Sequence, residues 1–128
     1  MRSTIIWQRI EGGLVFAAAL GLALFLGMEM PWWGALLVFF APDLTFLAYL
    51  AGPRVGALAY NLAHLYPMGF FIMGFTMFIG GASAIAVSVG LLLIAHAGFD
   101  RALGYGLKSP EGFGQTHLGP IGKHAKEA

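Results

Sequence analysis

The chain has no cysteine and very little charge. Without cysteine it has no disulfide framework, no thiolate metal site and no cysteine nucleophile. Charged residues make up only 10% of its 128 residues, whereas a soluble domain carries roughly 25%. The net charge of +1 argues against a nucleic-acid-binding protein, which needs a basic surface. The scarcity of charge thus excludes an ordinary soluble enzyme and a disordered chain.

Apolar residues take the place of the missing charges. They make up 59% of the sequence, and the mean hydropathy is +0.79. A helix crosses the hydrocarbon core of a membrane with about 20 apolar residues. Four segments meet this requirement: residues 12–28, 32–51, 55–79 and 82–103. Because short breaks containing proline or glycine separate them, the sequence predicts an all-α integral membrane four-helix bundle over residues 1–108.

The few basic residues are distributed unevenly about these spans. With four spans, the side that holds both termini and the middle turn carries every lysine and arginine: Arg2, Arg9, Arg54, Arg101, Lys108, Lys123 and Lys126. Glu29 is the only charged residue on the other side. By the positive-inside rule, both termini face the cytoplasm. Residues 109–128, rich in glycine and proline, are predicted to form an irregular cytoplasmic tail.

Ionisable residues within the spans need a separate explanation, because each costs at least about 2.5–3.5 kcal/mol near the membrane centre. Asp43 follows Pro42, and His64 precedes Pro67 by three residues. Since proline removes a backbone donor, kinks are expected at both positions. Tyr60, Asn61 and His64 share one helical face, as do His96 and Asp100. All these groups belong to the cytoplasmic half of the predicted spans.

Two histidines and two carboxylates suit zinc, manganese or iron(II). We therefore predict a divalent metal site formed by Asp43, His64, His96 and Asp100. A bound ion activates water at neutral pH, which predicts hydrolysis of an ester or phosphoester in a lipid-like substrate from the membrane. The candidate catalytic residues are Asp43 together with Glu11 or His117, the last two as general acid or base.

Other interpretations of the same residues remain open. Asp43 could pair with Arg54 or Arg101, and His96 with Asp100, so that the cluster only joins helices. The chain would then be an accessory subunit of a larger membrane complex or a homo-oligomer. A carboxylate–histidine proton relay is a third possibility. A haem or chlorin carrier that uses His64 and His96 as axial ligands is a fourth.

Several motifs resemble a family of small bacterial integral membrane proteins that is catalogued as a domain of unknown function. These motifs are Ala41-Pro42-Asp43-Leu44, the run from Tyr49 to Ala57, Tyr60-Asn61 with His64, Ala95-His96-Ala97-Gly98 with Asp100-Arg101, the run from Gly104 to Lys108, and Thr116-His117-Leu118-Gly119. The resemblance covers nearly the whole chain and implies a multi-pass protein of the bacterial inner membrane. A Pro-Asp pair in a span followed by histidines is also similar to patterns in metal-dependent membrane hydrolases.

Overall fold

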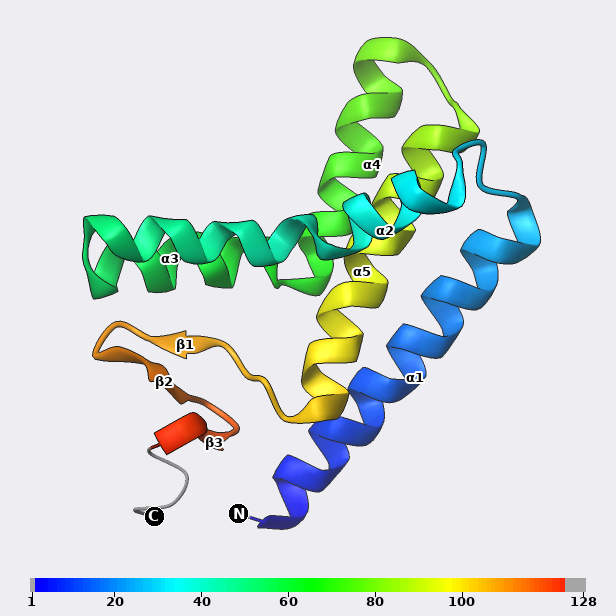
Figure 1. The fold of residues 1–128 in the computed structure, drawn as a ribbon. Coiled ribbons are helices and arrows are strands. Elements are labelled where there is room, and N and C mark those ends of the chain that lie inside the picture. The colour runs from blue at the N-terminus through cyan, green and yellow to red at the C-terminus, as the bar shows by residue number, and fades with distance from the viewer. Residues whose placement is uncertain (1, 124–128) are drawn as a thin grey trace.

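The computed structural model describes residues 2–123 as a helical protein with a small sheet near its C-terminal end (Figure 1). The helices are α1 (Arg2–Leu26), α2 (Trp32–Phe40), the 3₁₀ helix η1 (Ala41–Ala51), α3 (Pro53–Ala63), α4 (Tyr66–Gly80) and α5 (Ala84–Leu103). The strands are β1 (Lys108–Ser109), β2 (Gly112–Thr116) and β3 (Gly119–Pro120). The end of the predicted tail, residues 124–128, lies outside the described residues.

Helix α5 is the centre of the fold, with α1 packed against one side and α4 against another. Two glycine contacts bring these helices close together. A Cβ on Gly98 would lie 2.6 Å from the carbonyl oxygen of Gly12, and a Cβ on Gly90 would lie 2.8 Å from that of Gly69. Because small residues let helix backbones approach each other in a membrane, these glycines fix the position of α5 against both neighbours.

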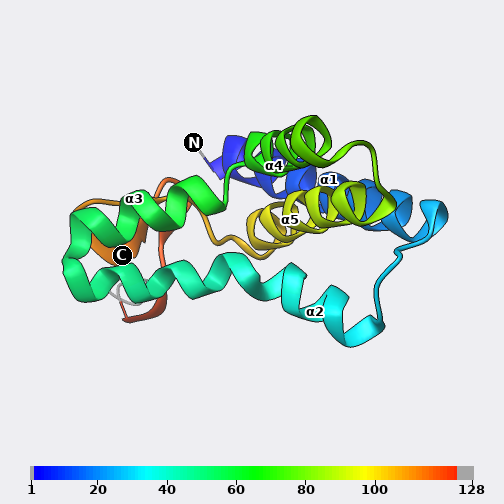
Figure 2. The same cartoon turned by 90° about the horizontal axis from the view of Figure 1, so that it is seen from above.

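Helices η1 and α3 form an antiparallel hairpin that extends sideways from the α1–α4–α5 group (Figures 1 and 2). The chain enters the hairpin where α2 changes to a 3₁₀ helix at Ala41, and it leaves through a 65° bend between α3 and α4. Pro42 and Pro67 each lie in the first turn of the helix that follows. Both kinks predicted from the prolines are therefore confirmed.

Three helices among residues 2–123 are long and apolar enough to cross a membrane: Arg2–Leu26, Trp32–Ala51 and Ala84–Leu103. The bent pair of α3 and α4 becomes a fourth if it is counted as one span. The regular four-helix bundle predicted from the sequence is not confirmed for the described residues. The 65° bend between α3 and α4 divides the third segment, and the η1–α3 hairpin extends sideways (Figures 1 and 2).

The predicted irregular tail is wrong for its described part. Strands β1, β2 and β3 form an antiparallel sheet in that order, beneath the η1–α3 hairpin in the view of Figure 1. The side-chain amide of Asn61 on α3 bonds both the backbone N–H and the backbone C=O of Lys108 at the start of β1. Glycines prevent a helix here, but they also permit the tight turns between short strands.

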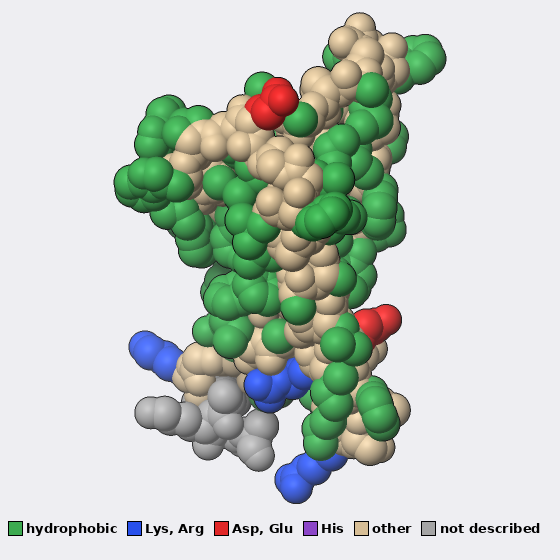
Figure 3. Space-filling model, turned by 90° about the vertical axis from the view of Figure 1, so that its right-hand side faces the viewer, with side chains coloured by type: hydrophobic (Ala, Val, Ile, Leu, Met, Phe, Trp, Pro, Cys, Tyr) green, Lys and Arg blue, Asp and Glu red, His purple; other side chains and the backbone are tan. Residues whose placement is uncertain are grey.

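The surface separates apolar from charged side chains. On the face shown in Figure 3, hydrophobic side chains cover the middle of the molecule, and lysine and arginine side chains gather at the end where the chain begins. Large apolar side chains such as Leu50, Phe25 and Phe78 are almost fully exposed. A soluble monomer rarely exposes so much contiguous apolar surface, so the surface fits the candidate membrane helices.

Candidate metal centre

Asp43 enters the site from the first turn of η1, directly after Pro42. At this point the chain changes from an α-helix to a 3₁₀ helix. Its carboxylate Oδ1 lies 3.3 Å from His64 Nε2 and 3.2 Å from His96 Nε2. The Asp43 side chain is 47% exposed, which makes it the one member of the cluster that is open to its surroundings.

His64 lies at the break between α3 and α4 and is fully buried. Its ring stacks on the ring of Tyr60, with centroids 3.7 Å apart. Its Nδ1 lies 2.7 Å from the backbone carbonyl oxygen of Tyr60. Since a carbonyl oxygen can only accept, Nδ1 carries the proton and donates it there. The lone pair of Nε2 therefore points into the cluster, as in most metal-binding histidines.

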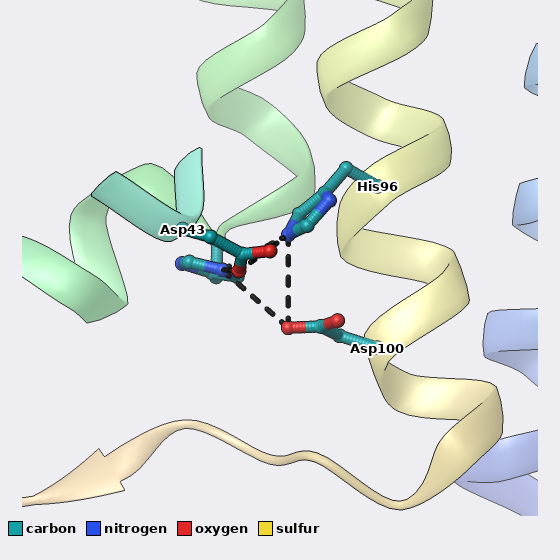
Figure 4. Close-up of side chains that lie close together, drawn as sticks. Asp43, His96 and Asp100 are labelled. Carbon is teal, nitrogen blue, oxygen red and sulfur yellow. Dashed lines mark hydrogen bonds and ion pairs between the residues drawn. The ribbon is translucent and has the colours of Figure 1, made fainter. Parts of the chain in front are cut away.

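His96 and Asp100 lie one turn apart on α5, and both are buried. Figure 4 shows them projecting from the same side of α5 toward Asp43. The hydroxyl of Tyr60 donates a hydrogen bond of 2.9 Å to Asp100 Oδ2. The His96 ring packs edge-on against Phe39, with centroids 5.2 Å apart. Tyr60 thus holds two members of the cluster, one by stacking and one by a hydrogen bond.

The four side chains bring one ligand atom each to a common point. Asp43, His64, His96 and Asp100 offer atoms that all lie within 4.8 Å of one another. The Nε2 atoms of His64 and His96 are 3.1 Å apart. Asp100 Oδ2 lies 3.4 Å from His64 Nε2 and 3.8 Å from His96 Nε2. An ion bound tetrahedrally at about 2.1 Å requires ligand atoms about 3.4 Å apart. The observed separations scatter around that value.

The chemistry of these groups also suits a cation among them. Two carboxylates and the lone pair of His64 Nε2 converge in a largely buried place. Negative charges that are brought together away from water repel strongly unless a cation is shared. The donor set suits zinc, manganese or iron(II). The predicted ligand set thus fits a divalent ion in both geometry and chemistry.

A cavity of about 340 Å³ adjoins the cluster. Asp43 and Asp100 line it together with Tyr60, Lys108 and Phe113. Burial lowers the pKa of Lys108, while the carboxylates of Asp100 and Asp43 act in the opposite direction. A small molecule in this cavity would lie beside the candidate metal ligands.

Glu11 and His117 line a different cavity, of about 230 Å³, together with Arg101 and Tyr66. Nδ1 of His117 accepts a hydrogen bond of 2.8 Å from the backbone N–H of Leu107. Partial burial lowers the pKa of His117, and the nearby charge of Arg101 lowers it further. The structure brings Glu11 and His117 to a common cavity, apart from the one that the carboxylates line. Their predicted acid–base role stays a prediction.

The arrangement bears on two of the alternative interpretations. Arg101 donates to the carbonyl oxygens of His64 and Tyr105, whereas the contacts found for Asp43 are with His64 and His96. An Asp–Arg pair that joins helices is thus not formed in the described part of the chain. Axial haem ligands lie on opposite sides of a macrocycle, but the two Nε2 atoms here are only 3.1 Å apart. That spacing favours a single ion over a haem or chlorin.

Sequence reasoning missed one residue of the site. The sequence marks Lys108 as a basic residue and as part of a family motif, but not as a site residue, whereas it lines the same cavity as Asp43 and Asp100. Its position depends on the sheet and on the two hydrogen bonds from Asn61. A signal was present, because Asn61 shares a helical face with Tyr60 and His64. The missing step was the sheet that brings Lys108 back to that face.

Fold and site together define a helical protein with candidate membrane-spanning helices and a buried candidate metal centre of two histidines and two aspartates. The chain belongs to the family described as a domain of unknown function (DUF4260), whose model matches residues 5–121. The family predicted from the sequence motifs is therefore confirmed. Neither a curated protein nor a solved structure matches the chain.

Proposed function

We propose that this protein is a metal-dependent hydrolase of the bacterial inner membrane that cleaves an ester or phosphoester bond in a lipid-like substrate. The observation that carries the proposal is the set of four ligand atoms within 4.8 Å of one another beside a cavity. The three buried side chains, His64, His96 and Asp100, hold the ion. Asp43 is partly exposed and lines the cavity, so it is the member that exchanges with water and acts as the base.

The chain's own groups then divide the work of hydrolysis. A divalent ion held by these residues would supply acidity, because it would bring the pKa of a bound water toward neutrality. The Asp43 carboxylate accepts a proton from the attacking water as the water oxygen bonds to the ester carbon or phosphorus. The bond to the alcohol oxygen breaks, and the proton passes from Asp43 to that leaving oxygen. Tyr60 fixes His64 and Asp100 throughout by stacking and hydrogen bonding.

The distribution of charge supports a location on the inner leaflet. Lysine and arginine side chains gather at the end of the molecule where the chain begins (Figure 3), and the positive-inside rule assigns that end to the cytoplasm. We therefore propose that both termini are cytoplasmic. The cavity beside the cluster is lined in part by Lys108 and Phe113 of the C-terminal sheet, so it opens on the same side. Lipids of the inner leaflet are the proposed source of substrate.

Elemental analysis of the detergent-purified protein tests the metal centre. We expect about one transition-metal ion per chain in the wild type, because the three buried ligands, His64, His96 and Asp100, bind such an ion with Asp43 beside them. His96→Ala should lose the ion, whereas His117→Ala, the same change outside the cluster, should keep it. Asp43→Asn should keep most of the ion and lose hydrolysis of lipid esters and phosphoesters.

Two outcomes would contradict the proposal. One is a full metal content in His96→Ala, which would place the ion elsewhere. The other is a wild-type protein that holds no ion after purification and reconstitution with zinc, manganese or iron(II). A metal-free protein that purifies with fixed partner chains would instead identify an accessory subunit of a larger membrane complex.

A further inference from the structure

Lys108 is held in a fixed position next to the candidate metal centre. It is the first residue of β1, and only 4% of its surface is exposed. The Asn61 side chain bonds its backbone on both sides: the Lys108 N–H donates to Asn61 Oδ1 at 2.6 Å, and Asn61 Nδ2 donates to the Lys108 carbonyl at 2.9 Å. The backbone of Lys108 is therefore held against α3, which fixes where its side chain begins.

Its ammonium group meets aromatic rings instead of an anion. Nζ lies 4.0 Å from the ring centre of Phe113, 4.9 Å from that of Tyr60 and 6.0 Å from that of Tyr105. Aromatic faces attract a cation but accept no strong hydrogen bonds from it. Among residues 2–123, no carboxylate or carbonyl partner is found for Nζ. Lysine is almost never this deeply buried unless its charge is paired. Since Lys108 lines the cavity, the donors of Nζ can bind a partner that enters it.

The charge balance of the cavity indicates the sign of that partner. Lys108, Asp43 and Asp100 line the same space of about 340 Å³. When a divalent ion occupies the cluster, the two aspartates neutralise it, and the charge of Lys108 is left uncompensated. A low-dielectric cavity with one excess positive charge attracts an anion. A neutral carboxylic ester would leave that charge unpaired, whereas a phosphoester carries the matching negative charge.

We infer that Lys108 is the anion-binding residue of this site and that it binds the phosphate group of the substrate. The inference rests on the proposed function and narrows its substrate from esters in general to phosphoesters. One phosphate oxygen then faces the cluster, while another accepts hydrogen bonds from Nζ. Lysine binds phosphate as a compact point charge. The Lys108 ammonium group suits this role, because it lies among three aromatic rings and not within a network of hydrogen-bond acceptors.

A second cavity argues that the phosphate belongs to a lipid. It has a volume of about 420 Å³, and its lining is entirely apolar. Phe99 lines both this cavity and the one with Lys108. Phe39 and Phe40 also line it and lie edge-on to the His96 ring. The apolar cavity therefore begins beside the cluster, where it can take the hydrocarbon chain of a substrate whose phosphate lies at Lys108.

The test measures binding of dodecyl phosphate to the metal-loaded protein in maltoside detergent by calorimetry. Lys108→Met removes the charge and keeps the unbranched stem between the rings. We expect it to weaken dodecyl phosphate binding about tenfold or more, the usual cost of losing one charged hydrogen-bonding partner. Lys123→Met makes the same change at an exposed position and should leave binding unchanged. Both variants should keep the metal content of the wild type.

Unchanged dodecyl phosphate binding in a metal-loaded Lys108→Met protein would overturn the inference and leave the proposed metal centre intact. A wild-type protein without metal would overturn the proposed function itself. If Lys108→Met does not fold, the wild-type protein still tests the inference, because equal affinity for dodecyl phosphate and the neutral dodecyl glucoside would refute an anion site.

Binding of inorganic phosphate distinguishes the two sources of the anion, a lipid phosphate and a free phosphate. Tighter binding of dodecyl phosphate supports a lipid, and equal binding overturns the assignment of the apolar cavity.

Discussion

Tyr60 connects the two histidine-bearing parts of the candidate centre. Its ring stacks on His64 from within α3, and its hydroxyl donates to Asp100 on α5. A carboxylate that accepts such a bond keeps one orientation, so that its other lone pairs face the ion. Hydrogen bonds to metal ligands tune affinity almost as strongly as the ligands do. Removing the hydroxyl of Tyr60 therefore tests this support for the metal centre while all four candidate ligands stay in place.

We expect Tyr60→Phe to lower metal affinity by about 10–100-fold, because the stacking on His64 remains but Asp100 loses its donor. A competition titration against a chelator of known affinity measures the change. Tyr49→Phe is the matched control, since the Tyr49 hydroxyl is buried and has no hydrogen-bond partner among the described residues. Equal affinities in the two variants would show that the Tyr60 hydroxyl does not support the ion.

At the residue scale, the sequence predicts which four ionisable side chains lie together, but it predicts less of what surrounds them. Asp43, His64, His96 and Asp100 stand out because ionisable groups in apolar spans are costly. The structure brings all four together. Glu11 and His117 lie outside the predicted spans and are predicted only as a general acid or base; they line another cavity. The local sequence around a residue does not show which residues from other helices will pack beside it.

At the scale of elements, the site depends on how closely α4 and α5 approach. His64 lies just before α4, while His96 and Asp100 lie on α5. Gly69 sets the distance between the two helices, because a Cβ there would lie 2.5 Å from the carbonyl oxygen of Gly90. Gly74 lies on the same helix, and a Cβ there would meet nothing within 4 Å. Gly69 and Gly74 therefore offer a matched comparison.

Gly69→Ala should separate α4 from α5, because an added methyl group collides with backbone that has no room to move. Overpacking of this kind costs about 1–3 kcal/mol. We expect a lower thermal unfolding temperature in detergent together with weaker metal binding, since His64 moves away from His96. Gly74→Ala should leave both quantities unchanged or slightly raise the stability. If both variants unfold at the same temperature, close packing at Gly69 is not a determinant of the fold.

The bends and the sheet differ in how far local sequence predicts them. Pro42 and Pro67 predict the two bends because proline removes a backbone donor regardless of its neighbours. The crosswise direction of the η1–α3 hairpin depends on packing, with the ring of Tyr49 set against Gly56. The C-terminal sheet has strands of two, five and two residues. Strands this short carry too little alternation of apolar and polar residues to be recognised.

For the whole molecule, the absence of cysteine makes the orientation simple to test. Single-cysteine variants at Ser3, Glu29 and Arg54 place one thiol each near the chain start, after α1 and at the tip of the η1–α3 hairpin. All three positions are exposed. If both termini and the middle turn face the cytoplasm, a membrane-impermeant maleimide should label only Glu29→Cys in spheroplasts. Ser3→Cys and Arg54→Cys should be labelled after lysis.

The cysteine-free wild type serves as the blank for this experiment. Labelling of Arg54→Cys from outside would contradict the proposed orientation, because it would place the hairpin tip and the chain start on opposite sides. Labelling of Glu29→Cys only after lysis would mean that the first helix does not cross the membrane. Either result would also move the cavity beside the cluster away from the inner leaflet.

The sequence by itself determined the candidate membrane-spanning character, the two bends, the family and the four candidate ligands. These follow from hydropathy, proline chemistry and the cost of ionisable groups in apolar segments, which are properties of short stretches of chain. Only the tertiary structure decided that the hairpin turns sideways, that a sheet forms beneath it, and that Lys108 faces the cavity beside Asp43 and Asp100. These features arise from contacts between residues far apart in the chain, such as Asn61 with Lys108 and Tyr60 with Asp100, and such contacts depend on how the helices pack.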